Sequence, residues 1–182
     1  MLSTLKPEYL ETDATPVPKS AKPRDVVTFA NEDFESGKMD GLPFIHGGTT
    51  THVADWHITK HKAKSGTQSL RSGNLNKKRG KSSDLTLKID SISGLKVSFY
   101  YLADVGDPFD HFEFQLDGNL RHKDGRPTKQ WQFFEMGVSP GPHEISFHLT
   151  SPSGAIKFDR SVSVDKFGAG AVMIDQLKVD PL

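Results

Sequence analysis

The sequence contains no cysteine, which excludes disulfide bonds, thiolate metal sites and cysteine nucleophiles. It has no apolar run near the roughly 20 residues that a membrane-spanning helix needs. Its first 25 residues show no apolar signal region. A glycine-rich phosphate loop, a nucleophile elbow and an HExxH zinc motif are absent as well. These absences remove the common sequence signatures of an enzyme, and we predict a non-catalytic protein.

Neither sign of charge predominates, because 23 Lys and Arg are balanced by 23 Asp and Glu. A neutral chain has no overall field that would attract nucleic acid or an anionic membrane, so neither partner is expected. The length of 182 residues suits one domain with a complete core and is short for two large ones. Twelve Phe within a hydrophobic fraction of only 35% indicate a core built from large aromatic side chains.

Residues 1–25 are expected to form an extended or flexible arm. Prolines stand at positions 7, 16, 18 and 23 among mainly polar residues. Proline removes backbone donors and restricts φ, and few apolar groups are present here for burial. A sharper hypothesis makes the protein a structural subunit of a larger assembly, in which this arm docks on neighbouring subunits through Tyr9 and Leu10.

From residue 26 to residue 182, apolar and polar residues alternate with the period of β-strands. The clearest runs are DLTLKID, LKVSFYYLA, HFEFQLD and HEISFHLT. Turn signals such as Ser93-Gly94, Asp117-Gly118-Asn119 and Pro140-Gly141-Pro142 separate the runs. We therefore predict an all-β domain over residues 26–182. It should be an antiparallel β-sandwich (jelly roll) of about eight to ten strands, preceded by the extended N-terminal tail.

The last expected strand carries an acidic residue in an apolar setting. In MIDQLKV, regular alternation places Met173, Asp175, Leu177 and Val179 on one inward face. A buried carboxylate must be hydrogen-bonded, paired or bound to a metal, because its desolvation is otherwise too costly. Asp175 is therefore the best single candidate for a functional site.

A set of short landmarks runs in order from about residue 27 to residue 180. It comprises FESG at 34–37, LPF at 42–44, a strand around Trp56, SLRSG at 69–73, VSFYY, FEFQLDG, Trp131, PGPH at 140–143 and MIDQL. This order resembles a family of non-catalytic jelly-roll modules of bacterial surface and secreted proteins, similar in shape to MAM-like and carbohydrate-binding sandwiches. The resemblance implies a binding module for carbohydrate or another surface ligand. It also implies an extracellular or cell-surface location, although the chain shows no signal peptide.

Modules of this family often hold a structural calcium ion that ties the first strand to the last, and the resemblance assigns Glu35 and Asp175 to it here. Asp33, Asp40 and backbone carbonyls of residues 31–40 would complete the shell, since calcium binds carboxylate and carbonyl oxygens. An alternative for Glu35 stays open, in which its carboxylate accepts hydrogen bonds from backbone amides where the first strand turns.

Two groups of residues are candidates for ligand binding. Tyr100 has the opposite parity to the apolar residues of its strand, and with Trp131 it would offer sugar rings an aromatic surface. A basic loop with Lys77, Lys78 and Arg79 would attract an anionic ligand, because clustered positive charge raises the local anion concentration. The competing explanations are structural, since large aromatics are mostly core residues and charged loops are mostly solvated.

Two chemical alternatives are disfavoured. A jelly-roll glycoside hydrolase would use Glu113 and Asp117, but Gln115 occupies the position between them on a face expected to be solvated. His57 and His61 lie about 13 Å apart if they share a strand, which is too far for joint zinc binding. Surface histidines are the expected outcome.

Overall fold

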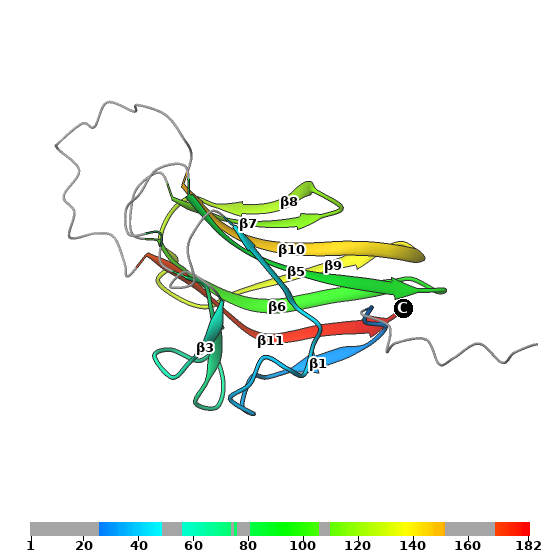
Figure 1. Cartoon of the computed structure of the whole chain (residues 1–182), viewed down its shortest axis with the longest axis horizontal. Helices are drawn as coiled ribbons and strands as arrows, with labels where there is room; N and C mark the ends of the chain where they lie inside the picture. Colours follow the sequence, from blue (N-terminus) through cyan, green and yellow to red (C-terminus); the bar gives the residue numbers. More distant parts are fainter. Residues whose placement is uncertain (1–25, 49–55, 74, 76–80, 106–109, 152–169) are drawn as a thin grey trace, which may run out of the picture.

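A computed structural model describes residues 26–48, 56–73, 75, 81–105, 110–151 and 170–182. Within these residues the regular structure consists of eleven β-strands in two antiparallel sheets, packed face to face (Figure 1). The predicted all-β sandwich is confirmed, with more strands than the eight to ten expected. The N-terminal arm and the basic residues Lys77, Lys78 and Arg79 lie outside the described residues. No helix in the described part is long and apolar enough to cross a membrane.

The five-stranded sheet has the strand order β2-β5-β10-β7-β8. Its strands are β2 (Ile45–Gly48), β5 (Lys81–Ser91), β7 (His111–Leu116), β8 (Asn119–Asp124) and β10 (Gly141–Ser151). The six-stranded sheet has the order β3-β4-β11-β6-β9, and β1 pairs with β11 beside this path. Its strands are β1 (Ala30–Glu32), β3 (His57–Thr59), β4 (Ser69–Arg71), β6 (Leu95–Asp104), β9 (Gln132–Val138) and β11 (Ala171–Pro181).

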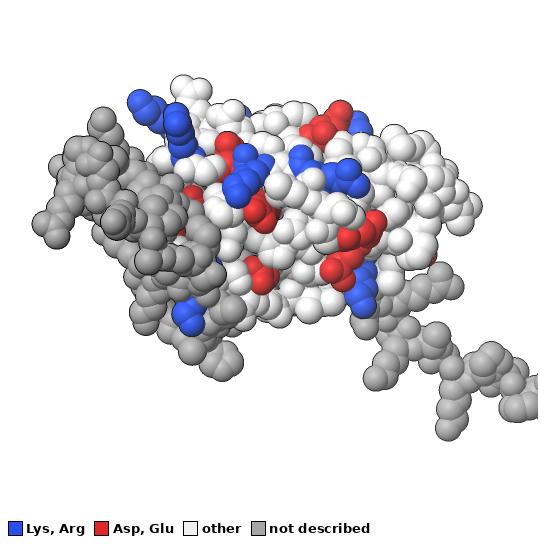
Figure 2. Space-filling model, turned by 90° about the horizontal axis from the view of Figure 1, so that it is seen from above, with Lys and Arg blue, Asp and Glu red and all other residues white. Residues whose placement is uncertain are grey.

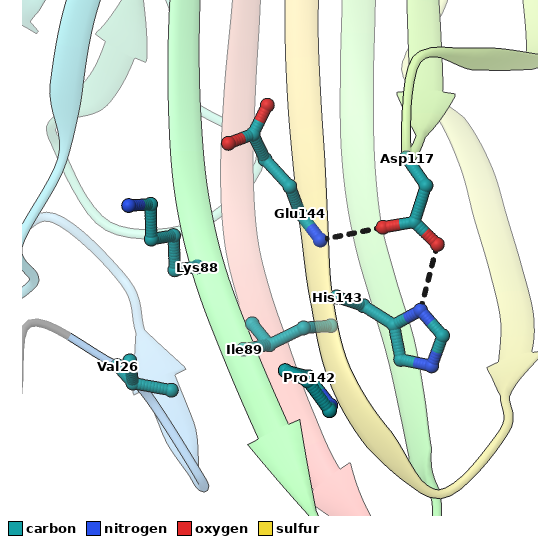
Figure 3. A pocket seen from close by; sticks show the side chains of 7 residues that line it. All are labelled: Val26, Lys88, Ile89, Asp117, Pro142, His143 and Glu144. Atoms are coloured by element: carbon teal, nitrogen blue, oxygen red, sulfur yellow. Dashed lines mark hydrogen bonds and ion pairs between the residues drawn. The ribbon is translucent and has the colours of Figure 1, made fainter.

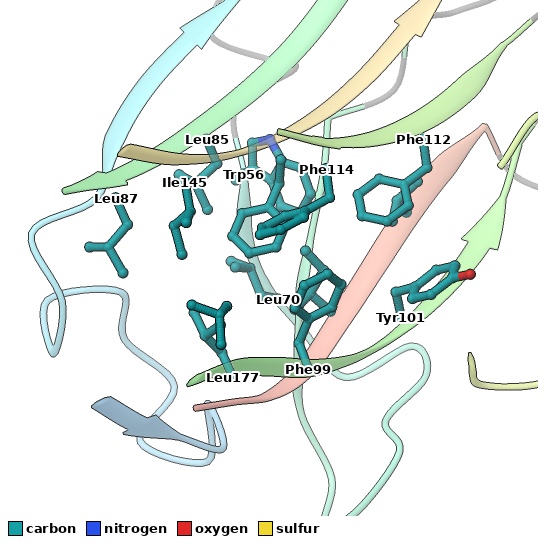
Figure 4. Packing of buried hydrophobic residues seen from close by; sticks show 14 of the residues in the cluster. Trp56, Leu70, Leu85, Leu87, Phe99, Tyr101, Phe112, Phe114, Ile145 and Leu177 are labelled. Atoms are coloured by element: carbon teal, nitrogen blue, oxygen red, sulfur yellow. The ribbon is translucent and has the colours of Figure 1, made fainter. Parts of the chain in front are cut away.

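Strand alternation sends the apolar side chains of both sheets into one shared core (Figure 4). The predicted inward sets of β5, β6, β7 and β10 are buried there, and Phe99 of β6 lies at their centre. Its ring contacts five aromatic rings at centroid distances between 5.1 and 6.5 Å: Tyr101, Phe112, Phe114, Phe134 and Phe147. The aromatic core expected from the composition is therefore what joins the two sheets.

The last strand departs from regular alternation at a β-bulge. The pairing of β11 with β6 shifts between Asp175 and Lys178, and Gln176 adopts a positive φ of 51°. Ile174 and Leu177 both enter the main core, although regular alternation would put them on opposite faces. The prediction that Met173, Asp175, Leu177 and Val179 share one inward face is therefore wrong. Met173 and Asp175 lie on the outer face, because the extra residue reverses the parity.

The packing of Phe99 leads to the first prediction. Phe99→Ala should lower the free energy of unfolding by about 3–5 kcal/mol, since it removes the ring that contacts aromatics of both sheets. Urea denaturation measures the loss. Phe29→Ala is the matched control, because the Phe29 side chain is 60% exposed and its truncation should cost little. Equal losses in the two variants would contradict this account of the core.

Candidate functional site

The loop of residues 60–68 joins β3 to β4 and lies against the outer face of the six-stranded sheet. Four contacts hold it there. The backbone N–H groups of Lys64 and Ser65 donate to Asp175 Oδ2 at 2.7 and 3.1 Å. Gln176 Nε2 donates to Ser65 Oγ at 2.8 Å, and Lys62 Nζ lies 3.2 Å from Asp104 Oδ2. This 60–68 loop therefore covers the outer side of β11 at the bulge.

Asp175 is fully buried beneath this loop although it lies on the outer face of its sheet. Its second carboxylate oxygen, Oδ1, accepts the backbone N–H of Gln176 at 2.7 Å. Burial raises the pKa of Asp175, the backbone donors of Ser65, Lys64 and Gln176 oppose that effect, and the negative charge of Glu35 adds to it. The carboxylate accordingly acts as an acceptor for a loop whose amides need one.

Glu35 holds the other end of the same loop. Its Oε1 accepts the N–H groups of Thr67 and Gln68 at 2.9 and 2.8 Å, and its Oε2 accepts the Thr67 hydroxyl at 3.0 Å. The backbone bond from Thr67, followed by that from Gln68, lowers the pKa of Glu35. Gly66 lies between the two anchors, and a Cβ at this position would come within 2.5 Å of the Glu35 carboxylate. We call Glu35, Asp175 and the 60–68 loop the carboxylate latch.

The predicted calcium ligands are only partly brought together. Glu35 and Asp175 accept hydrogen bonds from the same loop, through its N–H groups and the Thr67 hydroxyl. Asp33 Oδ1 accepts the N–H of Glu35 at 3.1 Å, and Asp40 is exposed. The part of the chain that the structure describes contains no group of three or more His, Asp and Glu arranged to hold a metal ion. Calcium at the latch stays a prediction.

Tyr100 and Trp131, the predicted aromatic binding residues, lie on the same outer face as the latch. Tyr100 pairs with Phe133 of β9, and their rings are 5.0 Å apart at 47°. Phe133 is 55% exposed, and Trp131 is half-buried against Leu102, Ala171 and Met173. We call Tyr100, Trp131 and Phe133 the aromatic face.

Phe133 is the most open ring of this face, and the sequence alone did not single it out. The pattern WQFF does place Trp131 and Phe133 on one side of the strand and Phe134 on the other. Phe134 indeed packs against the core. Met173 lies on the outer face because of the bulge in β11, and it packs against Trp131. Trp131 is therefore partly covered, whereas Phe133 stays exposed.

Acidic and basic side chains are mixed on the opposite face of the molecule (Figure 2). On the outer side of the five-stranded sheet, Glu113 lies 3.0 Å from His111 Nε2 and 3.5 Å from Lys123 Nζ. His148 Nδ1 likewise contacts Asp84 Oδ1 at 2.9 Å. The Glu113–Lys123 and Asp84–His148 contacts are cross-strand pairs, whereas His111 and Glu113 lie on the same strand.

The two carboxylates of the hydrolase alternative have separate structural partners. Desolvation opposes ionisation of Glu113, but its hydrogen bond from Gln115 and the charges of His111 and Lys123 outweigh it and lower its pKa. Asp117 lies in the β7–β8 turn, where the bonds from His143 and the Glu144 N–H lower its pKa (Figure 3). A glycosidase acid needs a raised pKa, so neither carboxylate suits that role.

Figure 3 also shows a pocket of about 270 Å³ beside Asp117, lined by β5, β10 and Val26. Both oxygens of Asp117 are engaged there in holding the β7–β8 turn against β10, at 2.7 Å from His143 Nδ1 and 2.9 Å from the Glu144 N–H. Asp117 and His143 therefore have a structural role in this pocket.

The histidines behave as expected for surface residues. His57 lies at the start of β3 and is exposed, and His61 follows the end of that strand and is exposed as well.

No protein-family model matches this chain, and no curated protein matches it either. Solved structures do match. The K1 cleaved adhesin domain of Lys-gingipain from Porphyromonas gingivalis W83 has a TM-score of 0.59 at 12% identity, covering 86% of this chain and 99% of that one. The K2 cleaved adhesin domain of Lys-gingipain has a TM-score of 0.55 at 16% identity, with 84% and 99% covered. TmCBM61, solved with β-1,4-galactotriose, has a TM-score of 0.52 at 16% identity, with 82% and 94% covered.

At these identities the likeness shows the fold. The chain is a β-sandwich of the jelly-roll type, similar in architecture to adhesin and carbohydrate-binding modules. The expected class of fold is therefore confirmed. The ligand has to be argued from the chain's own residues.

The carboxylate latch generates the second prediction. Asp175→Ala leaves the N–H groups of Lys64 and Ser65 without their acceptor, and the free energy of unfolding should fall by about 1–3 kcal/mol. Urea denaturation in the presence of EDTA measures this loss without any contribution from metal. Asp180→Ala, on the same strand, is the control and should change little. A loss no larger than that of the control would show that Asp175 does not hold the loop.

Proposed function

We propose that this protein is a non-catalytic binding module of the extracellular or cell-surface type, and that it binds carbohydrate through the aromatic face. The observation that carries the proposal is the open ring of Phe133, which lies beside Tyr100 on a rigid sheet. Contiguous exposed apolar surface, as opposed to a single exposed side chain, often marks a binding site, and Phe133 adjoins Tyr100. The C–H face of a pyranose is a suitable partner for such rings.

The surroundings of these rings support a sugar over a purely apolar partner. Lys64 extends over Tyr100. Further along β6 and β9, on the same outer face, Lys96 forms an ion pair with Glu135 at 3.4 Å. Polar groups beside an apolar platform can hydrogen-bond hydroxyl groups while the rings stack on carbon. The galactotriose in the TmCBM61 structure makes a β-linked galactan a reasonable first ligand to test.

The third prediction concerns this platform. Phe133→Ala should weaken polysaccharide binding about tenfold, because truncating a central aromatic contact typically costs more than 1 kcal/mol. Isothermal titration against soluble β-1,4-galactan, xylan and pectin measures the change. Leu120→Ala is the matched control, since Leu120 is 50% exposed but belongs to the other sheet.

The proposal fails in either of two ways. The wild-type chain binds none of the polysaccharides, or Phe133→Ala binds as well as Leu120→Ala. Equal melting temperatures of the two variants ensure that any difference in binding is not a folding effect.

Calcium at the carboxylate latch is a separate proposal, supported by the meeting of Glu35 and Asp175 at one loop and by the preference of calcium for carboxylate oxygens. Asp33 is the nearest further carboxylate along the chain. The ion would tie β11 to the turn after β1 and would relieve the repulsion between the two carboxylates.

The fourth prediction tests the metal. If calcium binds, millimolar calcium should raise the melting temperature of the wild-type chain, EDTA should reverse the rise, and Asp175→Asn should abolish it. Magnesium serves as the ionic-strength control. A wild-type melting temperature that does not respond to calcium contradicts the calcium proposal. The latch would then be held by hydrogen bonds alone.

A further inference from the structure

The edge of the aromatic face carries a cation in a defined position. Lys64 Nζ lies 4.8 Å from the centroid of the Tyr100 ring, a distance typical of a cation–π contact. The backbone of Lys64 is fixed, because its N–H donates to the buried Asp175. The latch therefore presents this ammonium group from an anchored point of the loop.

Two neighbouring lysines on this side of the sheet are paired with carboxylates. Lys62 lies 3.2 Å from Asp104, and Lys96 lies 3.4 Å from Glu135. Among the described residues, no carboxylate forms an ion pair with Lys64, whose side-chain contact is the tyrosine ring. Lys64 is thus a cation beside the aromatic face whose charge is available to a ligand.

The acidic residue closest in sequence to the open ring is already neutralised. Glu135 follows Phe133 by two positions on the same strand face, and its partner is Lys96. An anionic ligand on Phe133 would therefore meet little repulsion from this carboxylate. The Asp175 carboxylate lies buried beneath the loop, with its oxygens directed at backbone amides.

We propose that the ligand of the aromatic face is an anionic glycan, whose sugar ring stacks on Phe133 while its acidic group pairs with Lys64. This inference rests on the proposed carbohydrate function and specifies the class of sugar. The Phe133 ring and the Lys64 ammonium group flank the same tyrosine, at 5.0 and 4.8 Å from its ring.

The stereochemistry of acidic sugars fits this arrangement. In a uronic acid the carboxylate projects from the edge of the pyranose, close to the mean plane of the ring. A ring stacked on Phe133 directs that group sideways along the protein surface, toward a cation beside the platform. A neutral hexose has a hydroxymethyl group there, which can accept a hydrogen bond from an ammonium group but forms no ion pair with it.

The test compares polygalacturonate with its fully methyl-esterified form, which keeps the backbone and removes the charge. The wild-type chain should bind the acid about three- to tenfold tighter in low salt, as expected for one partly exposed ion pair, and added salt should reduce the preference. A sulfated galactan forms a third arm, and preference for it over polygalacturonate assigns a sulfate as the acidic group. Equal affinity for the acid, its ester and the sulfated chain overturns the inference.

The variants assign the preference to one residue. Lys64→Gln should lose the preference for the acid over the ester, and Lys64→Arg should retain that preference. Lys88→Gln, an exposed lysine of β5 on the other sheet, should behave as wild type. If Lys64→Gln retains the preference while Phe133→Ala abolishes binding, the acidic-glycan inference is wrong and the proposed function stands. If Phe133→Ala leaves binding to all three glycans intact, the proposed function itself fails.

Discussion

The β-bulge at Gln176 is the constraint on which the site depends. It reverses the parity of β11, so that Ile174 and Leu177 both reach the core and Asp175 remains on the outer face. Asp175 then needs donors, and the 60–68 loop supplies two backbone N–H groups. The loop in turn brings Lys64 over Tyr100. A single extra residue in the last strand thus links the packing of the core to the chemistry of the exposed face.

The two carboxylates of the latch respond to pH in opposite directions. The pKa of Glu35 is lowered by amide donors, so its contribution to stability is present above its unfolded pKa and is lost as the pH falls through its folded value. The pKa of Asp175 is raised by burial, so its ionisation opposes folding and a falling pH relieves that cost. The anchors at the two ends of the loop are therefore not released together by acid.

Much of the fold could be predicted from the sequence, because strand alternation is local: the runs containing Leu85 and Phe147 are buried as expected. The bulge could not, since Gln176 adopts its positive φ without a glycine or proline to indicate it. The outward position of Tyr100 could be predicted from its parity. Phe133 could not be singled out, because residues of other strands cover Trp131 and leave Phe133 exposed, and the sequence does not show which ring they cover. The acceptor role of Glu35 was one of two open alternatives, and its donors proved to come from residues 67 and 68.

The position of Lys64 beside Tyr100 and Phe133 supports placing function on the outer face of the six-stranded sheet. On the five-stranded sheet, Glu113 lies close to Lys123 on the neighbouring strand and to His111 on its own strand. On the six-stranded sheet, Lys64 contacts an aromatic ring in place of a carboxylate, next to the open ring of Phe133. An available cation beside exposed aromatic surface offers a ligand both stacking and charge pairing. The latch holds Lys64 beside the aromatic face, so the affinity of this face should also depend on Asp175, which is buried beneath the loop.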